Sequence, residues 1–151
     1  RLKMATSGGH TTVTELALAD LLSQTGAEAG FRQLRATIAA RVDEARGLIA
    51  QHFPRGTRVT DPPGGYILWV EFPCGLDSTA LFRACLAEHI CIAPGTMFSA
   101  TGRYRHCIRL GVGGRWSDAH RRALQRIGEL AQRQLAEAPN QAMDPVGASA
   151  A

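Results

Sequence analysis

The sequence has no apolar run of about eighteen residues, the length that a helix needs to cross a lipid bilayer. Its first residues, Arg1 to Thr6, also lack the apolar core of a secretory signal peptide. Methionine is missing from position 1, so we expect the chain to begin within a longer protein. These absences predict a cytoplasmic protein that has no membrane partner.

Cysteine pairs of the C-x-x-C type are missing as well. The four cysteines are Cys74, Cys85, Cys91 and Cys107, and no histidine lies at zinc-finger spacing from them. Three of them lie in or beside apolar segments, where a free cysteine behaves as a small hydrophobic residue. We therefore expect neither a metal site nor a disulfide framework, as is usual for a protein of the reducing cytoplasm.

Lysine is almost absent, because all but one of the 17 basic residues are arginines. The net charge is +4, but the arginines are scattered along the chain instead of forming a basic stripe. A DNA-binding domain usually concentrates its cations on one face, within a docking motif. We interpret most of these arginines as solvated surface residues and expect no direct nucleic-acid contact by this segment.

The 151 residues, 45% of them hydrophobic and 20% charged, suit one globular domain. Apolar residues recur at steps of three and four from Phe31 to Phe53, which predicts a long helix over 30–53. A shorter helix that ends before Gly26 precedes it. The remaining predicted elements are strands at 57–60, 66–72, 90–93 and 106–112, and helices at 77–88 and 117–135.

This order predicts an α+β fold: a small mixed or antiparallel sheet with helices packed on one side, preceded by a long helix. Residues 1–11 are interpreted as a connector, and residues 12–136 as the domain. Residues 137–151 contain few bulky apolar side chains, so we expect a disordered tail there.

Arg109 is the most informative polar residue of the strand at 106–112. Alternation directs Ile108 and Leu110 toward the core and sends Arg109 to the other face. A cation in an apolar strand is costly unless it is paired, and a guanidinium suits two parallel hydrogen bonds to a carboxylate. The pattern alone leaves two roles open, a structural salt bridge and a ligand site.

Three motifs stand in order along the chain: Pro63–Trp69, Ile92–Phe98 and Cys107–Leu110. This series resembles the C-terminal part of class I and II aminotransferases, over about residues 1–135. The resemblance implies the small domain of a fold-type-I, pyridoxal-phosphate-dependent protein. It further implies that Arg109 binds the α-carboxylate of an amino acid and that Phe98 lies near the same pocket.

The segment 98–110, followed by Trp116 and Ser117, is similar to MocR-type regulators of the GntR family. In these proteins an N-terminal winged helix-turn-helix binds DNA, and an aminotransferase-like domain senses an effector and dimerises. The resemblance implies a homodimeric parent protein with an amino acid or related small molecule as effector. DNA contact would occur only through a domain upstream of this chain.

The chain differs from the family in that its one lysine is not in the position of the catalytic lysine. A Schiff base with pyridoxal phosphate requires a lysine amine, and the only lysine, Lys3, lacks the family's serine-x-x-lysine setting. The resemblance places the catalytic lysine upstream, so we expect no catalytic residue here and no cofactor bound by this chain alone. Three functions stay open: a regulator's effector-binding segment, which we favour, the small domain of a true aminotransferase, and a non-catalytic α+β binding module.

Overall fold

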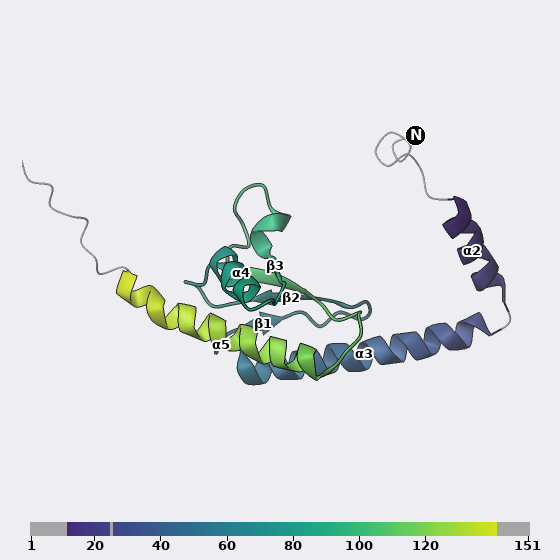
Figure 1. The fold of residues 1–151 in the computed structure, drawn as a ribbon, viewed down its shortest axis with the longest axis horizontal. Coiled ribbons are helices and arrows are strands. Elements are labelled where there is room, and N and C mark those ends of the chain that lie inside the picture. The colour runs from purple at the N-terminus through teal and green to yellow at the C-terminus, as the bar shows by residue number, and fades with distance from the viewer. Residues whose placement is uncertain (1–11, 25, 142–151) are drawn as a thin grey trace, which may run out of the picture. The chain divides into compact units, whose positions relative to one another are not determined.

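The computed structural model describes residues 12–24 and 26–141 (Figure 1). The chain divides into two compact units, residues 1–37 and residues 38–151. The predicted connector at 1–11 lies outside the described residues, as does the predicted tail beyond residue 141. None of the described helices combines the length and the apolar character needed to span a membrane.

The first unit contains helix α2 (Thr12–Ser23) and the beginning of α3 (Ala27–His52). Gly26, which adopts a φ of 104°, separates the two helices. This left-handed conformation is disfavoured for residues with a Cβ. The first helix ends at Ser23, before Gly26 as predicted. No residue of α2 is buried, and its leucines are exposed.

The second unit is built on an antiparallel sheet of four strands in the order β1-β2-β4-β3. The strands are β1 (Arg58–Val59), β2 (Ile67–Glu71), β3 (Ala93–Pro94) and β4 (Cys107–Gly111). The predicted α+β class is thereby confirmed, with an antiparallel sheet. Two central strands of five residues each carry the ladder that positions Arg109.

The predicted strand at 90–93 is wrong in position, because β3 begins only at Ala93. The N–H of Ile90 donates to the carbonyl of Cys85 at 2.9 Å and so helps to end the preceding helix. Pairing with β4 starts only at Ala93. Pro94, which belongs to the edge strand β3, lies opposite Ile108 of β4. Proline is tolerated at an edge, where no further strand needs its missing N–H.

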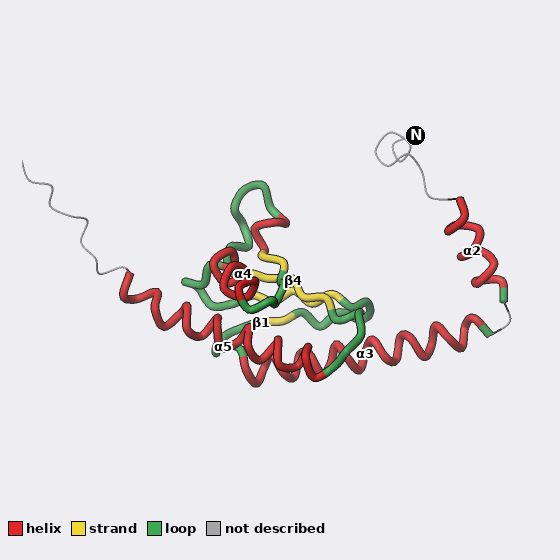
Figure 2. Tube along the Cα trace, in the orientation of Figure 1, coloured by secondary structure: helices red, strands yellow, loops and turns green. Residues whose placement is uncertain are grey.

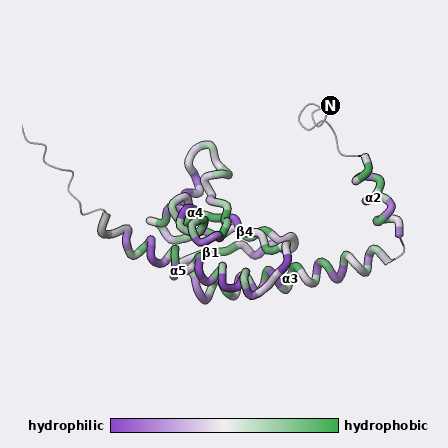
Figure 3. Tube along the Cα trace, viewed as in Figure 1, coloured by the Kyte–Doolittle hydropathy of each residue, from purple (hydrophilic) through white to green (hydrophobic). Residues whose placement is uncertain are grey.

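Helix α4 (Ser78–Ala87) follows β2, and α5 (Asp118–Gln141) follows β4 (Figure 2). Asp77 caps α4, since its Oδ1 accepts from the N–H groups of Thr79 at 2.8 Å and Ala80 at 3.3 Å. In Figure 3, α5 alternates between apolar and polar residues, the pattern of an amphipathic helix. It ends at Gln141, six residues beyond the predicted end at about 135, so the prediction of a disordered tail is wrong for residues 137–141.

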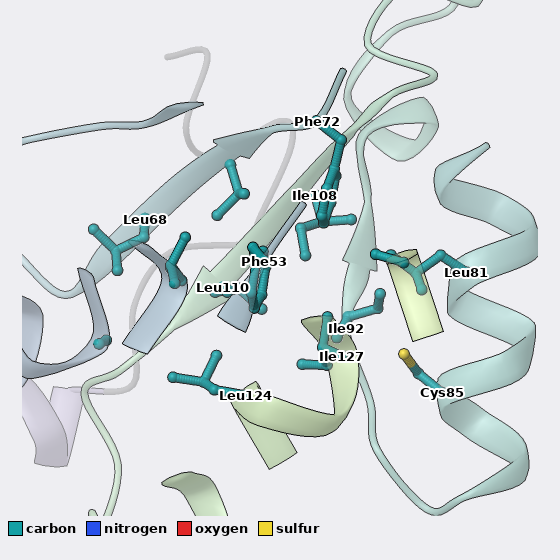
Figure 4. Packing of buried hydrophobic residues seen from close by; sticks show 14 of the residues in the cluster. Phe53, Leu68, Phe72, Leu81, Cys85, Ile92, Ile108, Leu110, Leu124 and Ile127 are labelled. Carbon is teal, nitrogen blue, oxygen red and sulfur yellow. The ribbon is translucent and has the colours of Figure 1, made fainter. Parts of the chain in front are cut away.

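The core lies between one face of the sheet and the helices of the second unit (Figure 4). Each fully buried aliphatic side chain contributes about 1.5–3 kcal/mol to stability through burial. The buried residues come from α3, β2, α4, β4 and α5 and include Ala45, Ile49, Leu68, Val70, Leu81, Cys85, Ile108, Leu110, Leu124 and Ile127. This burial fixes which face of β4 is turned toward the helices and leaves the opposite face for Arg109.

Candidate ligand-binding site

Arg109 lies in the middle of β4, on the face of the sheet that the helices do not cover. In the β2–β4 ladder, Arg109 is opposite Trp69, between two pairs of core residues. Its neighbours Ile108 and Leu110 are buried, whereas Arg109 is exposed. The alternation predicted from the sequence is therefore found in the strand.

The guanidinium of Arg109 lies over the ring of Phe98, with Cζ 4.6 Å from the ring centroid. Phe98 ends the short 3₁₀ helix η1 (Gly95–Phe98), which directly follows β3. A cation in this position is attracted by the ring face. The contact therefore places the positive charge of Arg109 against an aromatic ring.

Arg109 forms no ion pair with any acidic residue in the part of the chain that the structure describes. Its partner in the β2–β4 ladder is Trp69, and its partner on β3 is Ala93. Neither residue has a carboxylate. Within the described ranges, Arg109 therefore has no acidic partner with which to form a structural salt bridge, and its donors face solvent.

Two further aromatic contacts extend the site across the sheet. The Trp69 ring meets Phe98 at a centroid distance of 5.6 Å and Tyr104 at 5.3 Å, both edge to face. Such pairs are worth about 0.5–1.5 kcal/mol beyond the burial of their area. The guanidinium of Arg103 lies 5.5 Å from the centroid of Tyr104. We call Trp69, Phe98 and Tyr104 the aromatic cluster.

Backbone packing holds Tyr104 in place. Tyr104 adopts a φ of 64°, which is uncommon for a residue with a side chain. Its carbonyl accepts from the N–H of Cys107 at 3.0 Å and lies so close to Gly95 that a Cβ there would clash with it. The same Cβ would lie 2.8 Å from the carbonyl of Cys107. The glycine of the proline–glycine–x–x–phenylalanine motif is therefore needed for backbone contact with the loop that carries Tyr104.

A pocket of about 360 Å³ adjoins the aromatic cluster. Its lining residues are Trp69, Glu71, Arg103, Tyr104, His106 and Cys107. The Glu71 carboxylate accepts from Arg58 Nη2 at 2.6 Å and lies 3.4 Å from His106 Nε2. The hydrogen bond from Arg58 is the main cause that lowers the pKa of Glu71, while partial desolvation opposes it. Glu71 is thus a paired carboxylate.

The sequence predicted Arg109 and Phe98 as site residues but did not single out Trp69, Tyr104 and Arg103, which lie beside them or are linked to them by aromatic contacts. Trp69 could have been found, because it alternates with two core residues of β2 and therefore shares the outer face with Arg109. Tyr104 gave no such signal, since its position depends on a left-handed backbone inside a loop.

The described residues include no lysine and no group of three or more side chains arranged to hold a metal ion. An imine with pyridoxal phosphate requires an amine nucleophile. Residues 12–24 and 26–141 therefore supply no lysine amine for such an imine.

Comparison with known proteins shows which family the chain resembles. Residues 2–127 match the family model of aminotransferase class I and II. The HTH-type transcriptional regulator YdcR of Escherichia coli is 32% identical over 135 residues, which are 89% of this chain and 29% of the regulator. The 2-aminoadipate transaminase of Thermus thermophilus is 26% identical over 127 residues, which are 84% of this chain and 32% of the enzyme.

The fold is also found in a solved enzyme. The structure of LysN, the α-aminoadipate aminotransferase of Thermus thermophilus, complexed with N-(5'-phosphopyridoxyl)-L-leucine, aligns with a TM-score of 0.72 and 24% identity. The alignment covers 89% of this chain and 34% of that one. The chain thus spans about a third or less of the relatives it matches. Because the family model covers most of its residues, the chain belongs to the class I and II aminotransferase family.

Proposed function

We propose that this chain is the effector-binding small domain of a MocR-type transcriptional regulator. In this proposal, Arg109 binds the carboxylate of an amino acid or a related small molecule. The observation that carries it is the exposed guanidinium of Arg109, which lies on Phe98 and has no acidic partner among the described residues. The similarity to YdcR supports the regulator branch over the rest of the family.

The proposal assigns the other functions to the complete protein. Pyridoxal phosphate would be bound there through a lysine that the described residues lack, and DNA would be bound by a separate upstream domain. The complete protein would be a cytoplasmic homodimer, with residues 12–136 as its small domain. Residues 1–11 would connect this domain to the rest, and the residues after the end of α5 at Gln141 would form its tail.

The geometry suits recognition of a carboxylate. Phe98 supports the guanidinium from one side, and a guanidinium can donate two parallel hydrogen bonds to both oxygens of a carboxylate. Trp69 packs edge to face against Phe98 and so supports the ring beside the guanidinium. Hydrogen bonds between a guanidinium and a carboxylate are charge-assisted and stronger than those between neutral groups.

Replacement of Arg109 in the complete protein tests this role. Arg109→Ala should weaken binding of amino-acid effectors by about thirtyfold to several thousandfold, because the carboxylate loses its charged partner. The cofactor should remain bound, since the described residues do not hold it covalently. Arg109→Lys should restore only part of the affinity, because an ammonium cannot form the bidentate contact. Calorimetric titration measures the affinities, and visible absorbance measures the bound cofactor.

A matched control separates this effect from lost stability. Arg115→Ala removes another exposed arginine, in the loop that follows β4, and should leave binding unchanged. Thermal melts of all three variants report folding. If Arg109→Ala melts well below the parent while the folded fraction binds its ligand normally, Arg109 has a structural role and the assignment is wrong.

A genuine aminotransferase is the second candidate, favoured by the similarity to the 2-aminoadipate transaminase. Both candidates use a carboxylate-binding arginine, so loss of binding in the Arg109 variant does not separate them. Turnover does separate them. A regulator that only senses its effector should bind an amino acid without net conversion of the cofactor to pyridoxamine phosphate, whereas an enzyme should convert it and release the 2-oxo acid.

A further inference from the structure

We infer that Glu44 of α3 is a positioning residue for Arg109. Glu44 binds Trp116 and Arg121, and we call these three residues the anchor. The anchor holds the segment that follows β4, residues 112–116, against α3 and thereby fixes the end of the strand that carries Arg109. This inference rests on the proposed function of Arg109 and adds to it a residue that acts through that arginine.

Both carboxylate oxygens of Glu44 accept hydrogen bonds from residues that follow β4. Trp116 donates its Nε1–H to Oε2 at 2.8 Å, and Arg121, in the first turn of α5, donates its Nε–H to Oε1. The hydrogen bond from Arg121 is the main cause that lowers the pKa of Glu44, and the bond from Trp116 also lowers it, while partial desolvation opposes them. Glu44 is therefore ionised at neutral pH, and both hydrogen bonds are charge-assisted.

Arg41, on the same helix as Glu44, holds the segment through its backbone. Its Nη1 donates to the carbonyl of Gly114 at 2.8 Å and to that of Gly113 at 3.4 Å. Two consecutive glycines give a segment much conformational freedom. The contacts from Arg41 and from the anchor restrict this freedom at adjacent positions of the chain.

The end of β4 is paired on one side only. β2 pairs with β4 along its whole length, from Cys107 to Gly111. The edge strand β3 pairs only with Ile108 and Arg109. Beyond Arg109, no strand of the described structure lies on that side of β4. The position of Arg109 therefore depends on how the chain is held after the strand.

The segment also packs against the residue that precedes β2. The N–H of Val112 donates to the carbonyl of Tyr66 at 2.8 Å, and a Cβ on Gly113 would lie only 2.7 Å from Cγ of Tyr66. Residues 112–114 thus contact both Tyr66 and α3. Because close-packed groups transmit a displacement instead of absorbing it, a change in the contacts with α3 would reach β4.

A double-mutant cycle in the complete protein tests whether Glu44 acts through Arg109. The probes are the common L-amino acids, and calorimetric titration measures the one that binds most tightly. Glu44→Gln keeps the size of the side chain but removes its charge and one acceptor oxygen. It should weaken binding by about threefold to tenfold, because the ligand must then order the guanidinium of Arg109 itself. In the Arg109→Ala background, the same change should alter the affinity by no more than about twofold.

Two further variants sharpen the result. Trp116→Phe removes only the N–H donor and keeps a ring beside His120, and it should cause a smaller loss in the same direction. Glu129→Gln is the matched control, because Glu129 accepts from Arg126 at 2.7 Å and lies outside the anchor, so the affinity should not change. Half-exposed ion pairs contribute little to stability, so thermal melts of these variants should stay close to that of the parent protein.

Hydrogen exchange gives a measurement that needs no ligand. The amides of β4 should exchange faster in Glu44→Gln than in the parent protein, because a strand end without its support opens more often. They should exchange at the parent rate in Glu129→Gln. Mass spectrometry of a peptide that contains residues 107–112 measures both rates.

The outcomes separate this inference from the proposed function. If Glu44→Gln binds the probe as tightly as the parent protein, or weakens it equally with and without Arg109, Glu44 does not position Arg109, while the role of Arg109 stands. Unchanged hydrogen exchange in β4 would also refute the inference. If Arg109→Ala leaves every affinity unchanged, or if no amino acid binds the parent protein, the proposed function itself fails and the inference fails with it.

Discussion

A close backbone approach between two helices of the second unit gives a sharp test of the structure. Gly128 of α5 packs against the end of α3. A Cβ at this position would lie 2.8 Å from the carbonyl carbon of His52 and 3.1 Å from Cδ1 of Phe53, and would clash with the carbonyl oxygen of His52. Gln132, one turn later, donates to the same oxygen at 2.9 Å. Because two of these atoms belong to backbone, Gly128→Ala must move one helix away from the other.

The expected change in the free energy of unfolding combines one stabilising effect with two destabilising effects. Alanine is favoured over glycine in a helix interior by about 1 kcal/mol. Overpacking of a tight contact costs about 1–3 kcal/mol, and loss of the Gln132 hydrogen bond costs about 0.5–1.5 kcal/mol more. We expect Gly128→Ala to lower the free energy of unfolding by about 1–3 kcal/mol. For a domain of roughly 100 residues, each kcal/mol corresponds to about 4–8 °C in Tm.

Gly47 of α3 provides the matched control, because a Cβ there meets no atom within 4 Å. Gly47→Ala should therefore raise the free energy of unfolding by about 0.5–1 kcal/mol through helix propensity alone. Urea unfolding followed by circular dichroism measures both variants, and equal m-values would show that only stability has changed. If Gly128→Ala stabilises the protein as Gly47→Ala does, the two helices do not approach as closely as described.

Two more predictions concern ionisable groups. Arg58 lowers the pKa of Glu71, so their pair stabilises the fold at neutral pH, and this contribution is lost as the pH falls below the ordinary value of 4.5. The difference in urea stability between the parent protein and Arg58→Ala should shrink from about pH 7 to about pH 3, and a constant difference would contradict the pairing. Burial raises the pKa of the Cys85 thiol to about 11, whereas Cys91 is exposed. A thiol reagent at about pH 8 should therefore label Cys91 quickly and Cys85 only after denaturation, as detected by mass spectrometry. Rapid labelling of both thiols in the folded protein would show that Cys85 is accessible and would contradict its burial.

Local patterns predicted most of the helices and the central strands. The long helix expected at 30–53 extends over Ala27–His52, because its apolar period depends only on neighbours along the chain. The strand at 66–72 is found at Ile67–Glu71. The edge strand was misplaced because the sequence did not reveal that Ile90 donates its N–H to the preceding helix. Hydrogen bonds between adjacent elements therefore set boundaries that periodicity leaves open.

Prediction of the site from the sequence would have required information that strand alternation does not contain. Alternation gave the direction of Arg109 but left both a salt bridge and a ligand site open, because the partner on a neighbouring strand depends on the register. The register places Trp69 and Ala93 beside Arg109, and neither has an acidic group. The turn at Gly95 then brings Phe98 beneath the guanidinium. In the described structure, Arg109 is exposed, lies on an aromatic ring and has no acidic partner. The register between distant segments therefore supports a ligand site over a salt bridge.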